Sequence, residues 1–150
     1  MNYYGLTSLF NGIVVLTVGF YLLSRQRQNG LYQSFAAFSA CVGLWCIFYS
    51  FWQAQTNKTE ALMYMRLTML LCYPIPFAFL WFVLKLTGRS CKSWQSVALL
   101  ATPLFFAAFG FSPLMIKTMS PALNFSFWPH PGLLMNFFVP IFFTLILISY

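Results

Sequence analysis

Five long apolar stretches, separated by short polar breaks, make up most of the chain. They run from about Leu6 to Ser24, Phe35 to Trp52, Leu67 to Leu84, Trp94 to Phe111 and Leu133 to Tyr150. Each is close to the ~20 residues of helix that cross a hydrocarbon core of ~30 Å. Because lipid offers the backbone no hydrogen-bond partners, spanning segments of this kind are helical. The pattern predicts an all-α fold, a polytopic transmembrane helix bundle of about five spans.

The third stretch has two prolines, Pro74 and Pro76, inside an otherwise apolar run. Proline lacks a backbone donor, and its ring clashes with the preceding helical turn. We therefore expect this helix to kink near Leu70 to Cys72 and to open on one side.

Charged residues are only 6% of the chain, and hydrophobic residues are 61%, so a water-soluble domain could not cover its surface with polar groups. The basic residues divide unevenly between the two sets of connections. One set contains Arg25, Arg27, Lys85, Arg89 and Lys92, and the other contains Lys58, Arg66 and Lys117. Basic residues mark the cytoplasmic side of membrane proteins, so the sequence predicts an amino terminus outside the cell.

Several function classes are disfavoured by composition. The basic residues are scattered, which excludes a nucleic-acid partner. Glu60 is the only acid and His130 the only histidine, and they fall in different connections, so neither a metal cluster nor a catalytic pair of carboxylates is expected. We expect no cofactor and no enzymatic activity of this chain. The five apolar stretches hold no acid or histidine, which disfavours proton-coupled transport.

Aromatic residues, 21% of the chain, form two stripes at helical spacing. The second span carries Trp45, Phe48, Tyr49 and Trp52, and the third carries Tyr73, Phe77 and Trp81. One interpretation is helix packing together with interfacial aromatic belts. The other is that the two stripes face each other across a hydrophobic pocket for an apolar or amphipathic small molecule.

Arg66 lies about two helical turns before Pro74 on the third span. Its guanidinium could extend to the outer headgroups, or it could point into the bundle toward an anionic ligand or freed carbonyls. The pocket hypothesis selects six ligand-binding residues: Trp45, Tyr49, Trp52, Arg66, Tyr73 and Phe77.

Two outer connections are expected, Gln53 to Met65 and Ser112 to Gly132. The second is rich in proline yet apolar, and residues such as Trp128 have little reason to lie in bulk water. We expect it to lie in the membrane interface or to fold back over the bundle, as a simple anchor or as a lid.

The order of features resembles a known family. The segments that carry the likeness are SRQRQNG, LWCIFYSFWQ, EALMYMRL and LLCYPIPFAFLWFVLKLTGR. They resemble the amino-terminal seven-span sensor module of bacterial histidine kinases and related signalling proteins. Trp45, Arg66, Pro74 or Pro76 and the run Leu86-Thr87-Gly88-Arg89 occupy the positions of its motifs. The resemblance implies a sensory input domain in the bacterial inner (cytoplasmic) membrane, acting in a two-component signal-transduction system.

Residues 1–150 are therefore expected to form one transmembrane sensor domain, cut before two further spans and a cytoplasmic output domain. The expected partners are membrane lipids, a small-molecule ligand and a second copy in a homodimer. Two alternatives stay open, a small accessory membrane protein and a subunit of a channel or transporter.

Overall fold

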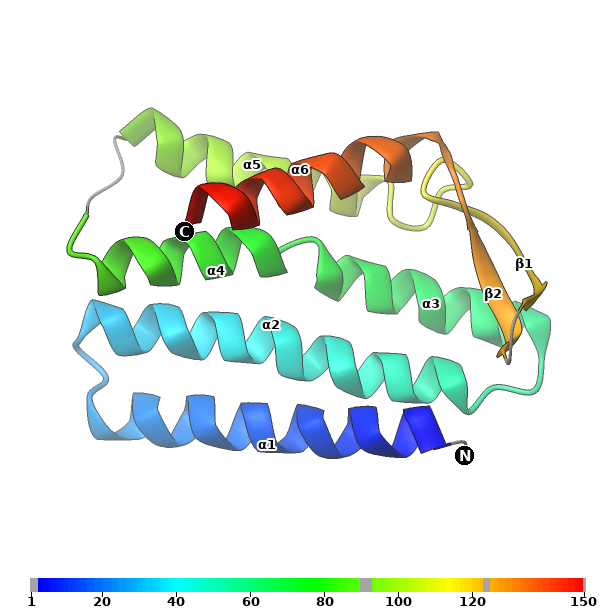
Figure 1. The fold of residues 1–150 in the computed structure, drawn as a ribbon, viewed down its shortest axis with the longest axis horizontal. Helices are drawn as coiled ribbons and strands as arrows, with labels where there is room; N and C mark the ends of the chain where they lie inside the picture. The colour runs from blue at the N-terminus through cyan, green and yellow to red at the C-terminus, as the bar shows by residue number, and fades with distance from the viewer. Residues whose placement is uncertain (1–2, 90–92, 123–124, 150) are drawn as a thin grey trace.

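The computed structural model describes residues 3–89, 93–122 and 125–149. Within these ranges it consists of helices that run roughly parallel to one long axis and a two-stranded hairpin across one end (Figure 1). The helices are α1 (Tyr3–Arg25), α2 (Gly30–Gln53), α3 (Lys58–Cys72), α4 (Ile75–Leu86), α5 (Ser93–Ala108) and α6 (Leu133–Ser149). The strands are β1 (Ile116–Ala122) and β2 (Phe125–Pro131). The predicted transmembrane helix bundle is confirmed, with the hairpin as an exception to the all-α expectation.

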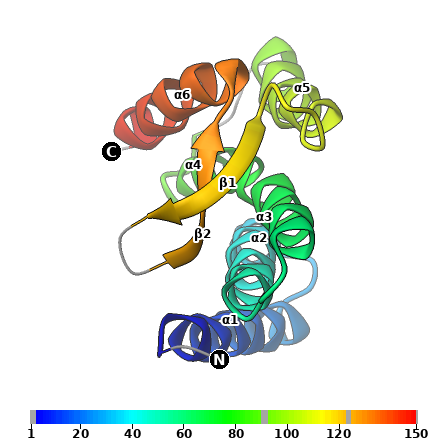
Figure 2. The ribbon, with the colours of Figure 1, turned by 90° about the vertical axis from the view of Figure 1, so that its right-hand side faces the viewer.

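Among the residues that the structure describes, three helical segments are long and apolar enough to cross a membrane: α1, α2 and the consecutive pair α3–α4 (Lys58–Leu86). The apolar part of α6, Leu133–Leu147, is shorter. α1 packs on α2, α2 packs on both α3 and α4, and α4 packs on α6. Seen along the helices, α1 therefore lies at one edge of the bundle, with α5 and α6 at the other (Figure 2).

α1 and α2 form the most extensive interface between elements. Gly5, Gly12 and Gly19 follow each other at intervals of seven residues on α1, and all three are buried. A Cβ atom at Gly12 would lie 2.8 Å from the carbonyl oxygen of Gly43 on α2, which no side chain could tolerate. The two backbones thus approach closely because small residues line the contact, as is common between membrane helices.

The expected kink is present as a break between α3 and α4, just beyond the predicted position. α3 ends at Cys72, and the Tyr73 amide still donates to the Met69 carbonyl at 3.1 Å. Pro74 is the N-cap of α4, and Pro76 lies in its first turn. A first turn has free N–H groups in any case, so the prolines begin a new helix at little cost. The offset of the two helices is visible in Figure 1.

The expected connection from Gln53 to Met65 is wrong in extent, because α3 begins at Lys58. The side chain of Asn57 accepts a hydrogen bond from the Thr59 amide at 3.0 Å, which caps the helix. Glu60 in the first turn favours the same start, because a carboxylate is stabilised near the positive end of a helix dipole. The first turn of α3 is polar, so its sequence resembles that of a loop.

The connection from Ser112 to Gly132 folds back over the bundle, as expected, but it does so as a β-hairpin. β1 and β2 pair antiparallel, with Met119 opposite Pro129 and Ser120 opposite Trp128. β1 and β2 both contact α3, so the hairpin covers the end of the bundle near the amino terminus (Figure 2).

Candidate functional site

Beneath the hairpin lies a buried group of side chains, here called the hairpin cluster. Its members are Trp52, Ala61, Met65, Ile116 and Met119. Of the predicted ligand-binding residues, Trp52 belongs to this cluster with 4% of its surface exposed, and Tyr49 packs against it. The cluster joins the end of α2 and the start of α3 to strand β1.

The predicted aromatic stripe on α2 is present. The ring centroids of Trp45 and Tyr49 are 5.7 Å apart, and those of Tyr49 and Trp52 are 5.1 Å apart. The hairpin extends the stripe, because the ring of Phe125 stacks on Trp52 at 6.2 Å and contacts Tyr4 at 5.6 Å. A continuous row of aromatic rings therefore runs from the middle of α2 to β2.

A second buried group, the Tyr73 cluster, surrounds the break between α3 and α4. It consists of Tyr73, Phe106, Met115 and Phe138. The Tyr73 ring contacts Phe138 of α6 at 5.0 Å and Phe106 of α5 at 6.1 Å. Phe77, the last predicted site residue, is 7% exposed in the first turn of α4, whereas Trp81 is 39% exposed. The second stripe is therefore interrupted, and Tyr73 contacts rings on α5 and α6.

The structure thus places Trp52 and Tyr49 at the hairpin cluster and Tyr73 in the Tyr73 cluster, while Trp45, Arg66 and Phe77 belong to neither. Direct ring contacts between α2 and the third span are made by other residues, with Phe38 against Phe79 at 5.4 Å and Phe51 against Tyr64 at 6.0 Å. This antiparallel register brings Trp45 to about the level of Tyr73, and Ser50 to about the level of Arg66. Whether the six residues bind a ligand stays a prediction.

Arg66 points toward the hairpin. One terminal nitrogen, Nη2, donates to the carbonyl oxygen of Ile116 at 3.3 Å. The Nε atom of the same guanidinium is buried and has no hydrogen-bond partner among the described residues. Arg66 therefore links α3 to β1 and keeps one donor unused inside the protein.

Further polar atoms are buried without a partner among the described residues. They include Nε1 of Trp45, Oγ of Ser50 and the hydroxyl oxygen of Tyr73. A buried polar group without a partner costs about 1–3 kcal/mol, so such groups are rare in proteins. Three of the six residues selected from the sequence, Trp45, Arg66 and Tyr73, hold an atom of this kind.

The hairpin is tied directly to the start of α6. The Gly132 amide donates to the carbonyl of Met115 at 2.8 Å, and the Leu134 amide donates to that of Leu114 at 2.9 Å. A Cβ atom at Gly132 would lie 2.1 Å from the Leu114 carbonyl oxygen, so only glycine fits. The base of the hairpin and the start of α6 are therefore joined by backbone hydrogen bonds.

Sequence reasoning missed the residues of the hairpin that complete these contacts, Ile116, Phe125 and Gly132. One sequence signal was available. Phe125 and Phe127 alternate with Ser126, which is typical of a strand, and the structure places both phenylalanines on the more buried side of β2. The two prolines of this segment, Pro129 and Pro131, hid the alternation, since proline is rare inside strands.

An apolar groove lies between α5 and α6, with a volume of about 390 Å³. Its lining residues are Ala101, Thr102, Phe105, Phe106, Leu134, Phe137 and Ile141. The groove borders the Tyr73 cluster through Phe106, which belongs to both.

The chain has no match among curated proteins or solved structures. Residues 7–150 match the family model of the N-terminal 7TM region of histidine kinase. This match covers almost the whole chain and agrees with the apolar helices of the structure. The chain belongs to the family of N-terminal 7TM regions of histidine kinases, and it is a membrane-embedded sensory input domain.

Proposed function

We propose that this input domain detects a small amphipathic molecule that carries hydrogen-bond acceptor oxygens. The supporting observation is the set of unpartnered donors at predicted site residues, the indole N–H of Trp45, the Nε–H of Arg66 and the hydroxyl of Tyr73. In this proposal the molecule binds in the outer half of the bundle. The receptor works as a homodimer in the inner (cytoplasmic) membrane of a bacterium.

The chemistry of the three groups selects the ligand class. An indole N–H and a guanidinium N–H can only donate hydrogen bonds, and a phenol hydroxyl donates readily. Each of them pairs with an acceptor oxygen such as that of a carboxylate or a carbonyl, and the positive charge of Arg66 favours the carboxylate. The surroundings are aromatic and aliphatic, so the rest of the molecule is expected to be apolar.

In this proposal Arg66 couples ligand binding to a movement of the hairpin. Its 3.3 Å hydrogen bond to the neutral Ile116 carbonyl competes poorly with an ion pair to a carboxylate, which can accept two hydrogen bonds from a guanidinium. A bound carboxylate would draw the guanidinium away from β1 and loosen the hairpin. Because Gly132 and Leu134 tie the hairpin to α6, that helix would shift and carry the signal onward.

Binding of dodecanoate to the purified protein in phosphatidylcholine nanodiscs tests this proposal. We expect saturable binding that is weakened about 5- to 10-fold by each of Trp45→Phe, Arg66→Gln and Tyr73→Phe, about 1–1.5 kcal/mol per lost hydrogen bond. Trp81→Phe is the matched control, since this exposed tryptophan should be replaceable without effect.

A cationic competitor of equal chain length, dodecyltrimethylammonium, has no acceptor oxygen and should not displace dodecanoate. Equal displacement by the two compounds, or unchanged affinity in Arg66→Gln and Tyr73→Phe, would refute the donor site. Absence of saturable binding would exclude simple long-chain carboxylates as the ligand class.

The family assignment favours this sensor function over the accessory-protein and transporter alternatives. The homodimer, the inner-membrane location and the further output domain stay predictions.

A further inference from the structure

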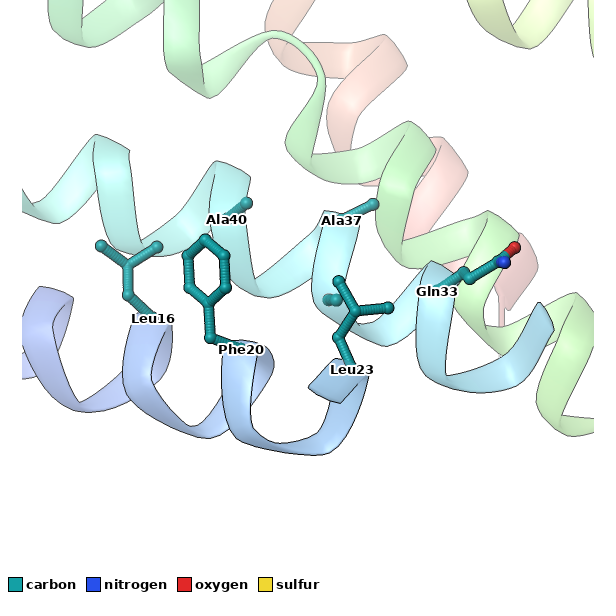
Figure 3. Close-up of a pocket in the computed structure, with 7 residues that line it drawn as sticks. Leu16, Phe20, Leu23, Gln33, Ala37 and Ala40 are labelled. Carbon is teal, nitrogen blue, oxygen red and sulfur yellow. The ribbon is translucent and has the colours of Figure 1, made fainter. Parts of the chain in front are cut away.

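A second apolar groove lies between α1 and α2, with a volume of about 320 Å³. Figure 3 shows its lining, in which Leu16, Phe20 and Leu23 extend from α1 toward the alanines of α2. The residues of α2 in the groove are Gln33, Ala36, Ala37 and Ala40. Because alanine side chains are short, they leave apolar space along α2 beside the longer side chains of α1.

One end of this groove is polar. Gln33 is the only polar side chain of the lining and stands nearest the connection between α1 and α2 (Figure 3). Its Nε2 donates to the backbone carbonyl of Arg27 at 2.8 Å. This hydrogen bond therefore holds the Gln33 side chain at the basic connection that follows α1.

Basic side chains gather at that end. Arg25 closes α1, and its guanidinium lies over the ring of Tyr21 at 5.3 Å from the ring centre. Arg27 is exposed in the connection. Lys85 reaches the same place from α4, because its Nζ would lie 3.8 Å from a Cβ atom built at Gly30, the first residue of α2. Three cations from two separate parts of the chain thus lie at the α1–α2 connection, the end of the groove where Gln33 stands.

This cluster has no acidic partner to neutralise it. The only acid of the chain is Glu60, in the first turn of α3. α3 begins at the end of the bundle that the hairpin covers, opposite the α1–α2 connection (Figure 1). Like charges held together without counter-charges repel one another, so an anion bound among them is favoured.

We propose that the groove binds one anionic phospholipid of the leaflet on the basic side of the bundle. One acyl chain lies between Phe20 and the alanines of α2, and the phosphate meets Arg25, Arg27 and Lys85. The charge complementarity identifies the occupant, because a zwitterionic lipid would bring a cation of its own to the cluster. Basic pockets between helices on the cytoplasmic side are a known form of lipid recognition.

Native mass spectrometry of the detergent-purified protein with phosphatidylglycerol or phosphatidylcholine tests this inference. We expect one retained phosphatidylglycerol per chain, bound about 100-fold more tightly than phosphatidylcholine, since each of the three basic residues contributes about fivefold. The double variant Arg25→Gln/Arg27→Gln should reduce this preference to about fivefold, the contribution of Lys85. Ala37→Phe, which fills the groove, should reduce retention of both lipids.

The double variant Lys58→Gln/Lys117→Gln is the matched control, since it removes the same charge outside this site. Equal retention of the two lipids by the wild type, or equal loss in the control, would overturn the proposal. Retained lipid in Ala37→Phe, together with loss of a dimer, would assign the groove to a second copy instead. If Ala37→Phe lowers helix content, the arginine variant, whose substitutions are exposed, decides the question.

Discussion

At the scale of single residues, Arg66 shows how a position can be recognised from sequence before its role is clear. Its place ahead of the proline pair marked it as a candidate, but two directions were open for its side chain. The structure has it donating to Ile116, fifty residues later in the chain, with Nε buried. No local pattern predicts such a partner, because the contact depends on how the hairpin folds back.

The close contact between Gly132 and the Leu114 backbone can also be tested with a single substitution. Gly132→Ala should separate the hairpin from the start of α6, because its Cβ atom would overlap the backbone carbonyl of Leu114. We expect faster amide hydrogen exchange at Met115 to Pro131, and a loss of stability of about 1–3 kcal/mol, the usual effect of overpacking.

Hydrogen exchange followed by mass spectrometry measures this change. Gly88→Ala is a control of the same chemistry, because Gly88 has no atom near a built Cβ, although its positive φ of 68° adds a local strain of its own. Unchanged exchange in the hairpin of Gly132→Ala would show that the backbone link to α6 is not rigid.

At the scale of elements, the third span is the most distinctive. It is two helices, and the Pro74 and Pro76 pair allows the second to start at a new angle. The break lies beside Tyr73, whose ring joins α5 and α6. A kink of this kind was predictable, since proline acts on its own helix, whereas the neighbours of Tyr73 were not.

Replacing both prolines tests whether they cause the break. In Pro74→Ala/Pro76→Ala, restored amides can donate within the helix, so α3 and α4 should align more closely. Spin labels at Met63→Cys and Trp81→Cys, in a background without native cysteines, should then approach about 27 Å, the rise of one straight helix at 1.5 Å per residue.

Pulsed electron spin resonance measures this distance, and the wild type should give a shorter one. Pro103→Ala in α5 is the control, because that proline lies in a different helix. Identical distance distributions in the wild type and the double variant would assign the break to packing by α5 and α6.

At the scale of the whole molecule, the two ends of the bundle differ in chemistry. The hairpin and the aromatic row cover one end, while Arg25, Arg27 and Lys85 gather at the other. Three members of the basic group predicted from sequence therefore lie at one end, and Lys92 of the same group lies outside the described residues. The outer position of the amino terminus stays a prediction, based on the excess of basic residues.

Labelling with a membrane-impermeant maleimide decides the orientation. In a background without native cysteines, Ser126→Cys of β2 should be labelled in right-side-out vesicles, and Gln28→Cys only after permeabilisation. Both positions are exposed in the structure, so access to the reagent depends on the side of the membrane. The reverse pattern would show that the basic end faces outward and would change the leaflet proposed for the lipid.

The sequence alone determined the properties that are local in the chain. Span length, helical conformation in lipid, the kink at the prolines and the aromatic stripe on α2 each depend on residues within a few turns of one another. It also carried the family likeness that the match of residues 7–150 confirms. Only the tertiary structure decided what meets across the bundle: Arg66 with Ile116, Trp52 with Phe125, Tyr73 with Phe138. These pairs are far apart in the chain, and in a sequence so uniformly apolar many pairings have similar hydrophobicity, so shape and backbone geometry choose among them.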